Sequence, residues 1–221
     1  MSDYNKMQVA EIWRYPVKSL AGEQIDVAEL LTDGIVGDRR VLVYNEQTRR
    51  LITSRTYPQL LGLKGTLDGN EMPLINGRPW DDSESQQAII SAAGPNARLI
   101  EWNGLERFDV LPLLVATDGA IQEFGYDRRR LRPNIIIGGV EGLAEREWPG
   151  HRMRIGKAVI EFAQLRGRCV MTTYDPDTLK QDHTVLRQIV KKFDGTLALD
   201  TAVLQGGRIS VGDAVEFADL K

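Results

Sequence analysis

Cysteine and histidine are scarce in this sequence. Cys169 is the single cysteine, and His151 and His183 are the two histidines among 221 residues. One cysteine cannot form a disulfide within the chain, and it cannot supply the four thiolates that an iron–sulfur cluster or an all-cysteine zinc site usually takes. With two histidines in addition, a transition-metal cage built from protein ligands alone is not expected. Any redox or metal chemistry must therefore be carried by a bound cofactor, to which Cys169 contributes at most one ligand.

An excess of positive charge and long apolar runs are also absent. Lys and Arg number 28 against 31 Asp and Glu, and the isoelectric point is about 5.5. The basic excess of a general nucleic-acid-binding protein is therefore missing. No apolar run approaches the roughly 18 residues needed to cross a bilayer. Residues 1–6 are polar and contain no hydrophobic signal-peptide core, so we expect a cytoplasmic protein with neither a nucleic acid nor a membrane as partner.

Short apolar runs punctuated by Gly, Asn and Asp predict a mainly β chain with a few short helices. In the first hundred residues we expect strands near 7–17, 25–31, 41–44, 51–53 and 60–66, arranged as an antiparallel barrel or sandwich. A composition shift near Gly104 divides this domain, residues 1–100, from a second domain, residues 101–221. In the second domain we expect strands near 111–116, 135–137, 153–155, 158–162, 208–211 and 214–217, and helices at 117–126, capped by Thr117, and 183–193.

Cys169 directly follows the short run Arg166-Gly167-Arg168 at the end of a predicted strand. Positive neighbours favour the thiolate, which is the form that attacks as a nucleophile and binds metals. The alternative is a free cysteine buried as a small apolar residue, which is the commoner fate of a lone cysteine. Local chemistry alone leaves both interpretations open.

Four arginines lie within residues 127–134, and such a cluster can clamp a phosphate or carboxylate through paired hydrogen bonds. The alternative for an arbitrary arginine run is a solvated charged loop. Arg132-Pro133-Asn134 stands apart, because it leads directly into the predicted buried strand 135–137 and would be held rigidly at its start. Two further clusters, residues 15–19 (YPVKS) and 37–40 (GDRR), are weak signals when each is taken alone.

Together these clusters carry a resemblance to a known family. The chain resembles the MOSC family, named for the C-terminal domain of molybdenum cofactor sulfurases, in the subgroup with an additional N-terminal β-barrel that includes the amidoxime-reducing components. The matching motifs follow one another along nearly the whole chain: Y-P-V-K-S at 15–19, G-D-R at 37–39, T-x-R at 53–55, R-P-N at 132–134, R-C-x-x-T-T-x-D-P at 168–176 and I-x-V-G-D at 209–213. The resemblance implies a MOSC-type β-barrel preceded by an N-terminal β-barrel subdomain.

The family binds a molybdopterin-type molybdenum cofactor, and the resemblance implies that Cys169 is the protein ligand of molybdenum. It also implies that Lys18, Ser19 and Arg39 meet the pterin or its phosphate, and that the rest of the site is lined by Thr117, Arg132, Asn134, Gly167 and Arg168. Pyridoxal phosphate binding is a further property associated with the family. Since Lys18 and Cys169 are far apart in the sequence, the two halves of the chain should meet at one cleft.

By the same resemblance we expect an oxidoreductase that reduces the N–O bond of N-hydroxylated compounds, such as hydroxylaminopurines or amidoximes. Its electrons would come from a separate protein of the ferredoxin or flavin type. One cysteine cannot hold a cluster, and no G-x-G-x-x-G turn predicts a dinucleotide site in this chain. Asp109 is a candidate proton donor or supporting group, with a simple turn aspartate as the alternative.

The sequence also departs from the family pattern at two positions. Many relatives have a second cysteine where this chain has Arg166, and a Gly-Gln or Gly-Asn pair where it has Leu199-Asp200. One rival function is a non-catalytic carrier of the molybdenum cofactor or a sulfur-transfer module. Another is a cysteine hydrolase that uses Cys169 and His183, which is disfavoured because no glycine turn of the oxyanion type accompanies the histidine.

Overall fold

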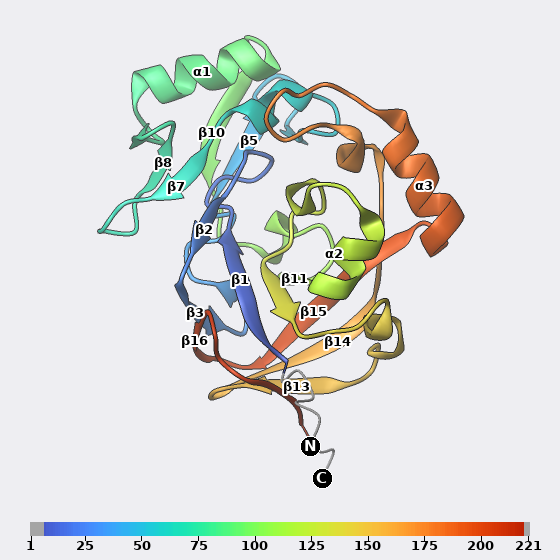
Figure 1. Cartoon of the computed structure of the whole chain (residues 1–221). Helices are drawn as coiled ribbons and strands as arrows, with labels where there is room; N and C mark the ends of the chain where they lie inside the picture. The colour runs from blue at the N-terminus through green and yellow to red at the C-terminus, as the bar shows by residue number, and fades with distance from the viewer. Residues whose placement is uncertain (1–6, 219–221) are drawn as a thin grey trace, which may run out of the picture.

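A computed structural model describes residues 7–218, and strands dominate it (Figure 1). The prediction of a mainly β chain with a few short helices is confirmed. Residues 1–6, on which the expectation of a cytoplasmic protein was based, lie outside the described part. No helix within residues 7–218 is long and apolar enough to span a membrane.

The largest element is an eight-stranded sheet that combines both halves of the chain. In spatial order it contains β17 (Val215–Phe217), β13 (Arg152–Ile155), β14 (Ala158–Gly167), β15 (Thr196–Gln205), β11 (Leu113–Thr117), β12 (Ile135–Gly138), β1 (Gln8–Arg14) and β2 (Glu23–Ile25). Neighbouring strands are antiparallel except β11 and β12, which run parallel. A bridge between Gln8 and Ala214 links β1 to the segment before β17, but no continuous ladder closes a barrel within the described residues.

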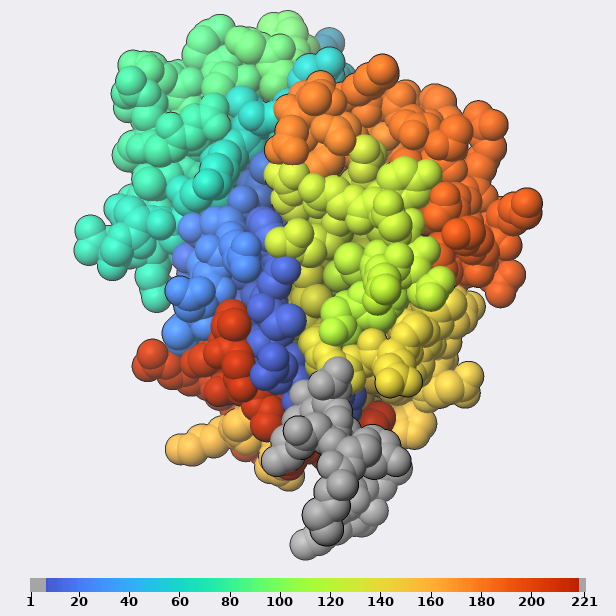
Figure 2. Space-filling model, viewed as in Figure 1, coloured from blue at the N-terminus to red at the C-terminus, as the bar shows by residue number. Residues whose placement is uncertain are grey.

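Three smaller sheets contain three strands each. They are β10 (Ala97–Glu101), β5 (Val41–Asn45) and β6 (Arg50–Ile52); β16 (Gly207–Ser210), β3 (Val27–Leu31) and β4 (Gly34–Ile35); and β7 (Gly65–Leu67), β8 (Pro73–Ile75) and β9 (Arg78–Pro79). Because β3 pairs with β16, the C-terminal segment packs against N-terminal strands, as the red and blue surfaces in Figure 2 show. The sheets therefore cross the predicted domain division at residue 100, which stays a prediction.

Three α-helices and five short 3-10 helices connect the strands in the described chain. The α-helices are α1 (Ser83–Ala93), α2 (Asp118–Phe124) and α3 (His183–Phe193), and the 3-10 helices are η1 (Pro58–Gly62), η2 (Leu105–Arg107), η3 (Arg128–Arg130), η4 (Ala144–Glu147) and η5 (Val170–Thr173). Asp82, Thr117 and Asp182 cap the three α-helices by accepting a hydrogen bond from a backbone N–H of the first turn. The predicted cap at Thr117 and the predicted helix at 183–193 are confirmed.

Some elements differ from the predictions. α1 lies in a region where only strands were expected, and its buried face is narrow, consisting of Ser85, Ile89 and Ala93. β15 was missed because Asp200 and Thr201 interrupt its apolar run, and only the finished fold buries these two polar residues. The strand predicted at 60–66 is instead η1 followed by β7, since a proline at the start of η1 favours a helical turn.

Hydrophobic clusters hold these elements together. The largest packs the eight-stranded sheet against β3, β4 and β16, and it contains the fully buried Ile12 and Phe162. A second cluster lies between β5, β6 and α1 in the N-terminal half. A third joins α2 and α3 to Leu131, and so anchors the segment that leads into β12.

Gly119, in the first turn of α2, leaves no room for a side chain. A Cβ there would lie 2.4 Å from the carbonyl oxygen of Val140 and 2.5 Å from that of Gly142. We expect Gly119→Ala to lower the free energy of unfolding by about 1–3 kcal/mol, because backbone atoms cannot move away cheaply. Urea denaturation measures this, with Gly69→Ala as the control, since a Cβ at Gly69 meets no atom within 4 Å. Equal midpoints for the two variants would contradict the expectation.

Candidate functional site

One cavity of about 250 Å³ collects residues from distant parts of the sequence. Its lining includes nine of the ten predicted site residues: Lys18, Ser19, Arg39, Asp109, Arg132, Asn134, Gly167, Arg168 and Cys169. The other lining residues are Thr53, Ser54, Arg55, Phe108, Leu111, Leu114, Arg130, Leu131, Arg166 and Met171. The expected cleft between the two halves is present, while the roles of its residues stay predictions.

Thr117 is the predicted site residue that does not line the cavity. It is fully buried; its hydroxyl accepts a hydrogen bond from the N–H of Ala120 at 3.1 Å and donates one to Glu145 Oε2 at 3.2 Å. Burial raises the pKa of the Glu145 carboxyl, and the hydrogen bond from the Thr117 hydroxyl partly offsets this rise. Thr117 therefore fixes the start of α2 instead of facing a ligand.

Positive charge dominates the cavity. Seven lining side chains are cationic, namely Lys18, Arg39, Arg55, Arg130, Arg132, Arg166 and Arg168, and Asp109 is the single carboxylate in the lining. Four of these cations form ion pairs, whereas the described residues offer no carboxylate partner to Arg55, Arg132 or Arg168. A concave surface with this balance attracts and holds anions.

Asp38 is a fully buried carboxylate next to this lining. It accepts hydrogen bonds from the backbone N–H of Tyr15 at 2.7 Å and from Nδ2 of Asn134 at 3.3 Å, and it pairs with Arg39. The Oδ1 of Asn134 in turn accepts a hydrogen bond from the N–H of Leu114 at 3.2 Å. Since protein groups engage both atoms of the Asn134 amide, this residue supports the arginine beside it.

Tyr15 packs against two arginines of the cavity. Its ring centroid lies 4.4 Å from Cζ of Arg132 and 5.1 Å from Cζ of Arg39, within the range of cation–π attraction. The Tyr15 hydroxyl donates a hydrogen bond to the carbonyl of Pro133 at 3.1 Å. Burial raises the pKa of Tyr15 to about 12, although the charges of Arg132 and Arg39 lower it. The phenol therefore stays neutral and keeps donating at physiological pH.

Three lining residues have a left-handed backbone. The φ angles are 74° at Ser19, 53° at Arg39 and 57° at Arg132. A left-handed backbone conformation costs a non-glycine residue on the order of 1 kcal/mol of stability. It persists where contacts with surrounding residues hold the residue in place. The Asp38 and Tyr15 contacts do this for both arginines. The cavity is therefore held in shape before any ligand arrives.

Two lining arginines keep a buried nitrogen that has no hydrogen-bond partner among the described residues. These are the Nε atoms of Arg130 and Arg168. Nη2 of Arg168 donates to the carbonyl of Leu131 at 2.7 Å. Burial, aided by the neighbouring charge of Arg166, lowers the pKa of Arg168 to about 10. The guanidinium stays charged at neutral pH, and an anion in the cavity would offset the cost of burying it.

Cys169 is half-buried where β14 ends and η5 begins. The carbonyl of Cys169 accepts two hydrogen bonds from Thr172, one from its backbone N–H at 3.1 Å and one from its side-chain hydroxyl at 2.9 Å. Its Sγ lies in the cavity lining, 3.8 Å from Nη2 of Arg55. The sulfur is thus directed to the positive cavity and is not packed away as a small apolar group.

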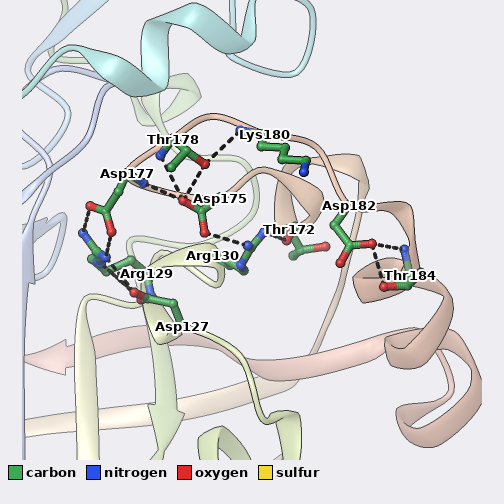
Figure 3. A network of polar contacts seen from close by, with 10 residues as sticks. All are labelled: Asp127, Arg129, Arg130, Thr172, Asp175, Asp177, Thr178, Lys180, Asp182 and Thr184. Atoms are coloured by element: carbon green, nitrogen blue, oxygen red, sulfur yellow. Dashed lines mark hydrogen bonds and ion pairs between the residues drawn. The ribbon is translucent and has the colours of Figure 1, made fainter.

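A network of ion pairs fixes the segment that follows the cysteine (Figure 3). Arg129 lies between Asp127 and Asp177, with a 2.7 Å ion pair to each. Arg130 pairs with Asp175 at 3.0 Å and also lines the cavity. Neighbouring arginines of this run therefore have different roles. Arg129 holds the loop after the cysteine through Asp177, and Arg130 lines the cavity.

Asp109 lies exposed at the rim of the cavity, with Oδ1 3.0 Å from Nζ of Lys18. Partial loss of hydration beside the neighbouring residues raises the pKa of Asp109, but the charge and hydrogen bond of Lys18 and the charges of Arg39 and Arg166 lower it, and the net shift is downward. Asp109 is therefore a carboxylate at neutral pH. Of the two roles expected for it, this state favours a supporting group that holds Lys18 over a proton donor.

Arg166 and Asp200 occupy the two places where the sequence departs from the pattern of the family it resembles, and they pair with each other. Nε of Arg166 lies 2.7 Å from Oδ1 of Asp200, a fully buried carboxylate. Gln164 donates a hydrogen bond to the other oxygen of Asp200 at 3.1 Å. The two departures are thus one ion pair, of which Arg166 lines the cavity and Asp200 does not, and local sequence patterns could not reveal it.

Sequence reasoning also left several neighbours of the cavity without a role. Each lies inside a motif that carries the family resemblance or in the arginine cluster: Tyr15, Asp38, Arg55 and Arg130. The motif spacing was the available signal. It could not show which side chain of each motif points to the cavity and which one supports it.

Comparisons with known proteins identify the family. Residues 6–101 match the MOSC N-terminal beta barrel domain, and residues 116–216 match the MOSC domain. The chain belongs to the MOSC family and carries both of these domains.

Curated relatives are distant but cover most of the chain. Mitochondrial amidoxime-reducing component 1 of Homo sapiens is 24% identical, over 77% of this chain and 67% of its own length. The Mus musculus protein of the same name is also 24% identical, over 84% and 71% of the two lengths. Among solved structures, the YUAD protein from Bacillus subtilis matches with a TM-score of 0.54 and 14% identity, over 98% of this chain and 97% of that one. This last likeness shows the fold alone.

Tyr15 makes the stability of the fold sensitive to alkaline pH. Its pKa is near 10 in an unfolded chain and about 12 in the fold. The neutral phenol therefore contributes fully below pH 10, and its contribution of up to about 3 kcal/mol is lost as the pH rises from about 10 to 12. We expect Tyr15→Phe to lose less free energy of unfolding than the wild type across this interval. Urea denaturation at several pH values measures it, with Tyr44→Phe as control; parallel losses in all three proteins would contradict the expectation.

Proposed function

We propose that this chain is a molybdenum-cofactor-dependent oxidoreductase that reduces N-hydroxylated compounds with electrons from a separate protein. The observation that carries the proposal is one cavity in which the Cys169 thiol lies among seven cationic side chains. A thiolate is a soft, strongly donating ligand that suits molybdenum, and clustered cations suit a dianionic phosphate. The relatives named amidoxime-reducing components support the substrate class.

The residues of the cavity fit such a cofactor. The buried Nε atoms of Arg130 and Arg168 are unpartnered donors among the described residues, and Arg132 has no carboxylate there to neutralise it. An anionic pterin would satisfy these groups, and Cys169 would bind its metal. The residues that would hold the pterin and its phosphate are Lys18, Ser19, Arg39, Arg132, Gly167 and Arg168, with Asn134 keeping Arg39 in place.

The proposed reaction is simple to balance. An N-hydroxylated compound R–NH–OH takes up two electrons and two protons and gives R–NH2 and water, and the bound cofactor would supply the two-electron centre. The cationic residues of the chain would bind the reactants, and Phe108, Leu111 and Met171 add apolar surface to the lining of the cavity. Asp109 holds Lys18 at the exposed rim, where protons arrive from solvent.

The thiol of Cys169 is the group on which the proposal depends most. We expect Cys169→Ser to keep its fold, because oxygen and sulfur are similar in size, but to lose molybdenum and more than about 99% of its reductase activity, because a neutral hydroxyl is a poor ligand for a soft metal. Metal analysis, thermal unfolding and assays with a reduced viologen dye measure these effects. Unchanged metal content and turnover in the variant would refute the ligand role. Stoichiometric metal without turnover in the wild type would favour the carrier function.

The second test concerns the source of electrons. We expect the cofactor-loaded protein to be inert toward amidoximes with NADH or NADPH alone, because its single cysteine cannot hold a cluster and it has no dinucleotide motif. A reductase with a ferredoxin or flavin centre, or the dye, should start turnover. Steady turnover with a nicotinamide as the sole reductant would show that no partner is needed.

A further inference from the structure

Arg55 differs from the other cations of the cavity. It is the one exposed arginine or lysine of the lining, whereas the other six are partly buried. The described residues provide it with no carboxylate partner, in contrast to Lys18, which pairs with Asp109 at the same rim. Its Nη2 instead lies 3.8 Å from Sγ of Cys169. A guanidinium with free donors thus lies at the mouth of the cavity, directly beside the sulfur.

The place of Arg55 in the fold separates it from the residues fitted to the cofactor. It follows β6 in the N-terminal half, next to the buried Ser54, whereas Arg132 and Arg168 lie on the C-terminal half near Leu131. Those arginines keep their charges away from solvent and need an anion that stays. An exposed guanidinium at the mouth suits an anion that comes and goes, because its donors are hydrated between binding events.

We propose that Arg55 determines substrate specificity by binding a negatively charged group of the substrate. The proposal rests on the proposed function and narrows its substrate class to N-hydroxylated compounds that carry an anionic group such as a carboxylate. A guanidinium binds such a group through two parallel hydrogen bonds. The same charge disfavours cationic analogues at the sulfur, so Arg55 selects both by attraction and by repulsion.

Steady-state kinetics of the cofactor-loaded enzyme test the selection. The probes are an aryl amidoxime and the same compound with a ring carboxylate, with a reduced viologen dye as donor. We expect Arg55→Met to raise the KM for the carboxylate compound about tenfold. The kcat for that compound and the KM for the neutral compound should stay within about twofold of their wild-type values. Arg55→Lys should recover part of the affinity. Arg50→Met, an exposed arginine of β6 outside the cavity, is the matched control for the loss of one charge.

Alkylation gives a second readout that needs no turnover. Cys169 is the only cysteine, so any alkylation of a thiol in the full-length chain without cofactor reports this site. We expect Arg55→Met to lower the ratio of the rate with anionic iodoacetate to the rate with neutral iodoacetamide about three- to tenfold at low salt. The difference should shrink at high salt, since the mouth is exposed to screening ions. Arg50→Met should keep the wild-type ratio.

The outcomes separate this inference from the proposed function. An equal alkylation ratio in Arg55→Met and wild type, or an equal rise in KM for both amidoximes, would overturn the role of Arg55. Loss of molybdenum from Arg55→Met would also overturn it, because Arg55 would then belong to the cofactor site. If the loaded wild type reduces neither amidoxime, the proposed function fails, while the alkylation ratio still decides whether Arg55 draws anions to the sulfur.

Discussion

The buried carboxylate of Asp38 is the contact on which the rest of the site depends. A charge removed from water must be matched by partners, and leaving it unmatched costs several kcal/mol. Here the partners are the backbone N–H of Tyr15, the amide of Asn134 and the guanidinium of Arg39. They come from both halves of the chain, so satisfying one carboxylate fixes the halves against each other. The strained backbone of Arg39 and the packing of Tyr15 against the arginines follow from that docking.

The cations of the cavity differ in whether a carboxylate neutralises them. Arg166 is neutralised by the buried Asp200, so it adds shape to the wall but little net charge. Arg130 is neutralised by Asp175, although its buried Nε has no hydrogen-bond partner among the described residues. Arg168 has no carboxylate partner among the described residues, and the lowered pKa records that cost. The field inside the cavity therefore depends on which arginines are compensated as much as on their number.

The sequence was informative where the physical signal is local or carried by a motif. Thr117 was correctly predicted as a helix cap because its partner, Ala120, is three residues away, but its distance from the cavity depends on Glu145 in another segment. The motifs placed Lys18 and Cys169 at one site, since a family pattern records long-range contacts indirectly. β15 and the Arg166–Asp200 pair were missed for the opposite reason: a buried aspartate in an apolar run is explained only by a partner on another strand.

The first strand also has implications for when the site can form. Val9 in β1 donates its N–H to the carbonyl of Asp213 and accepts a hydrogen bond from the N–H of Gly212. The strand that leads to Tyr15 and Lys18 thus gains its last partners near the opposite end of the described chain. During synthesis, Val9 lacks these two hydrogen bonds until the intervening residues have emerged from the ribosome. A ligand that needs Lys18 and Cys169 together can bind only after both residues have left the ribosome, and the hydrogen bonds of Val9 to residues 212 and 213 complete the first strand later still.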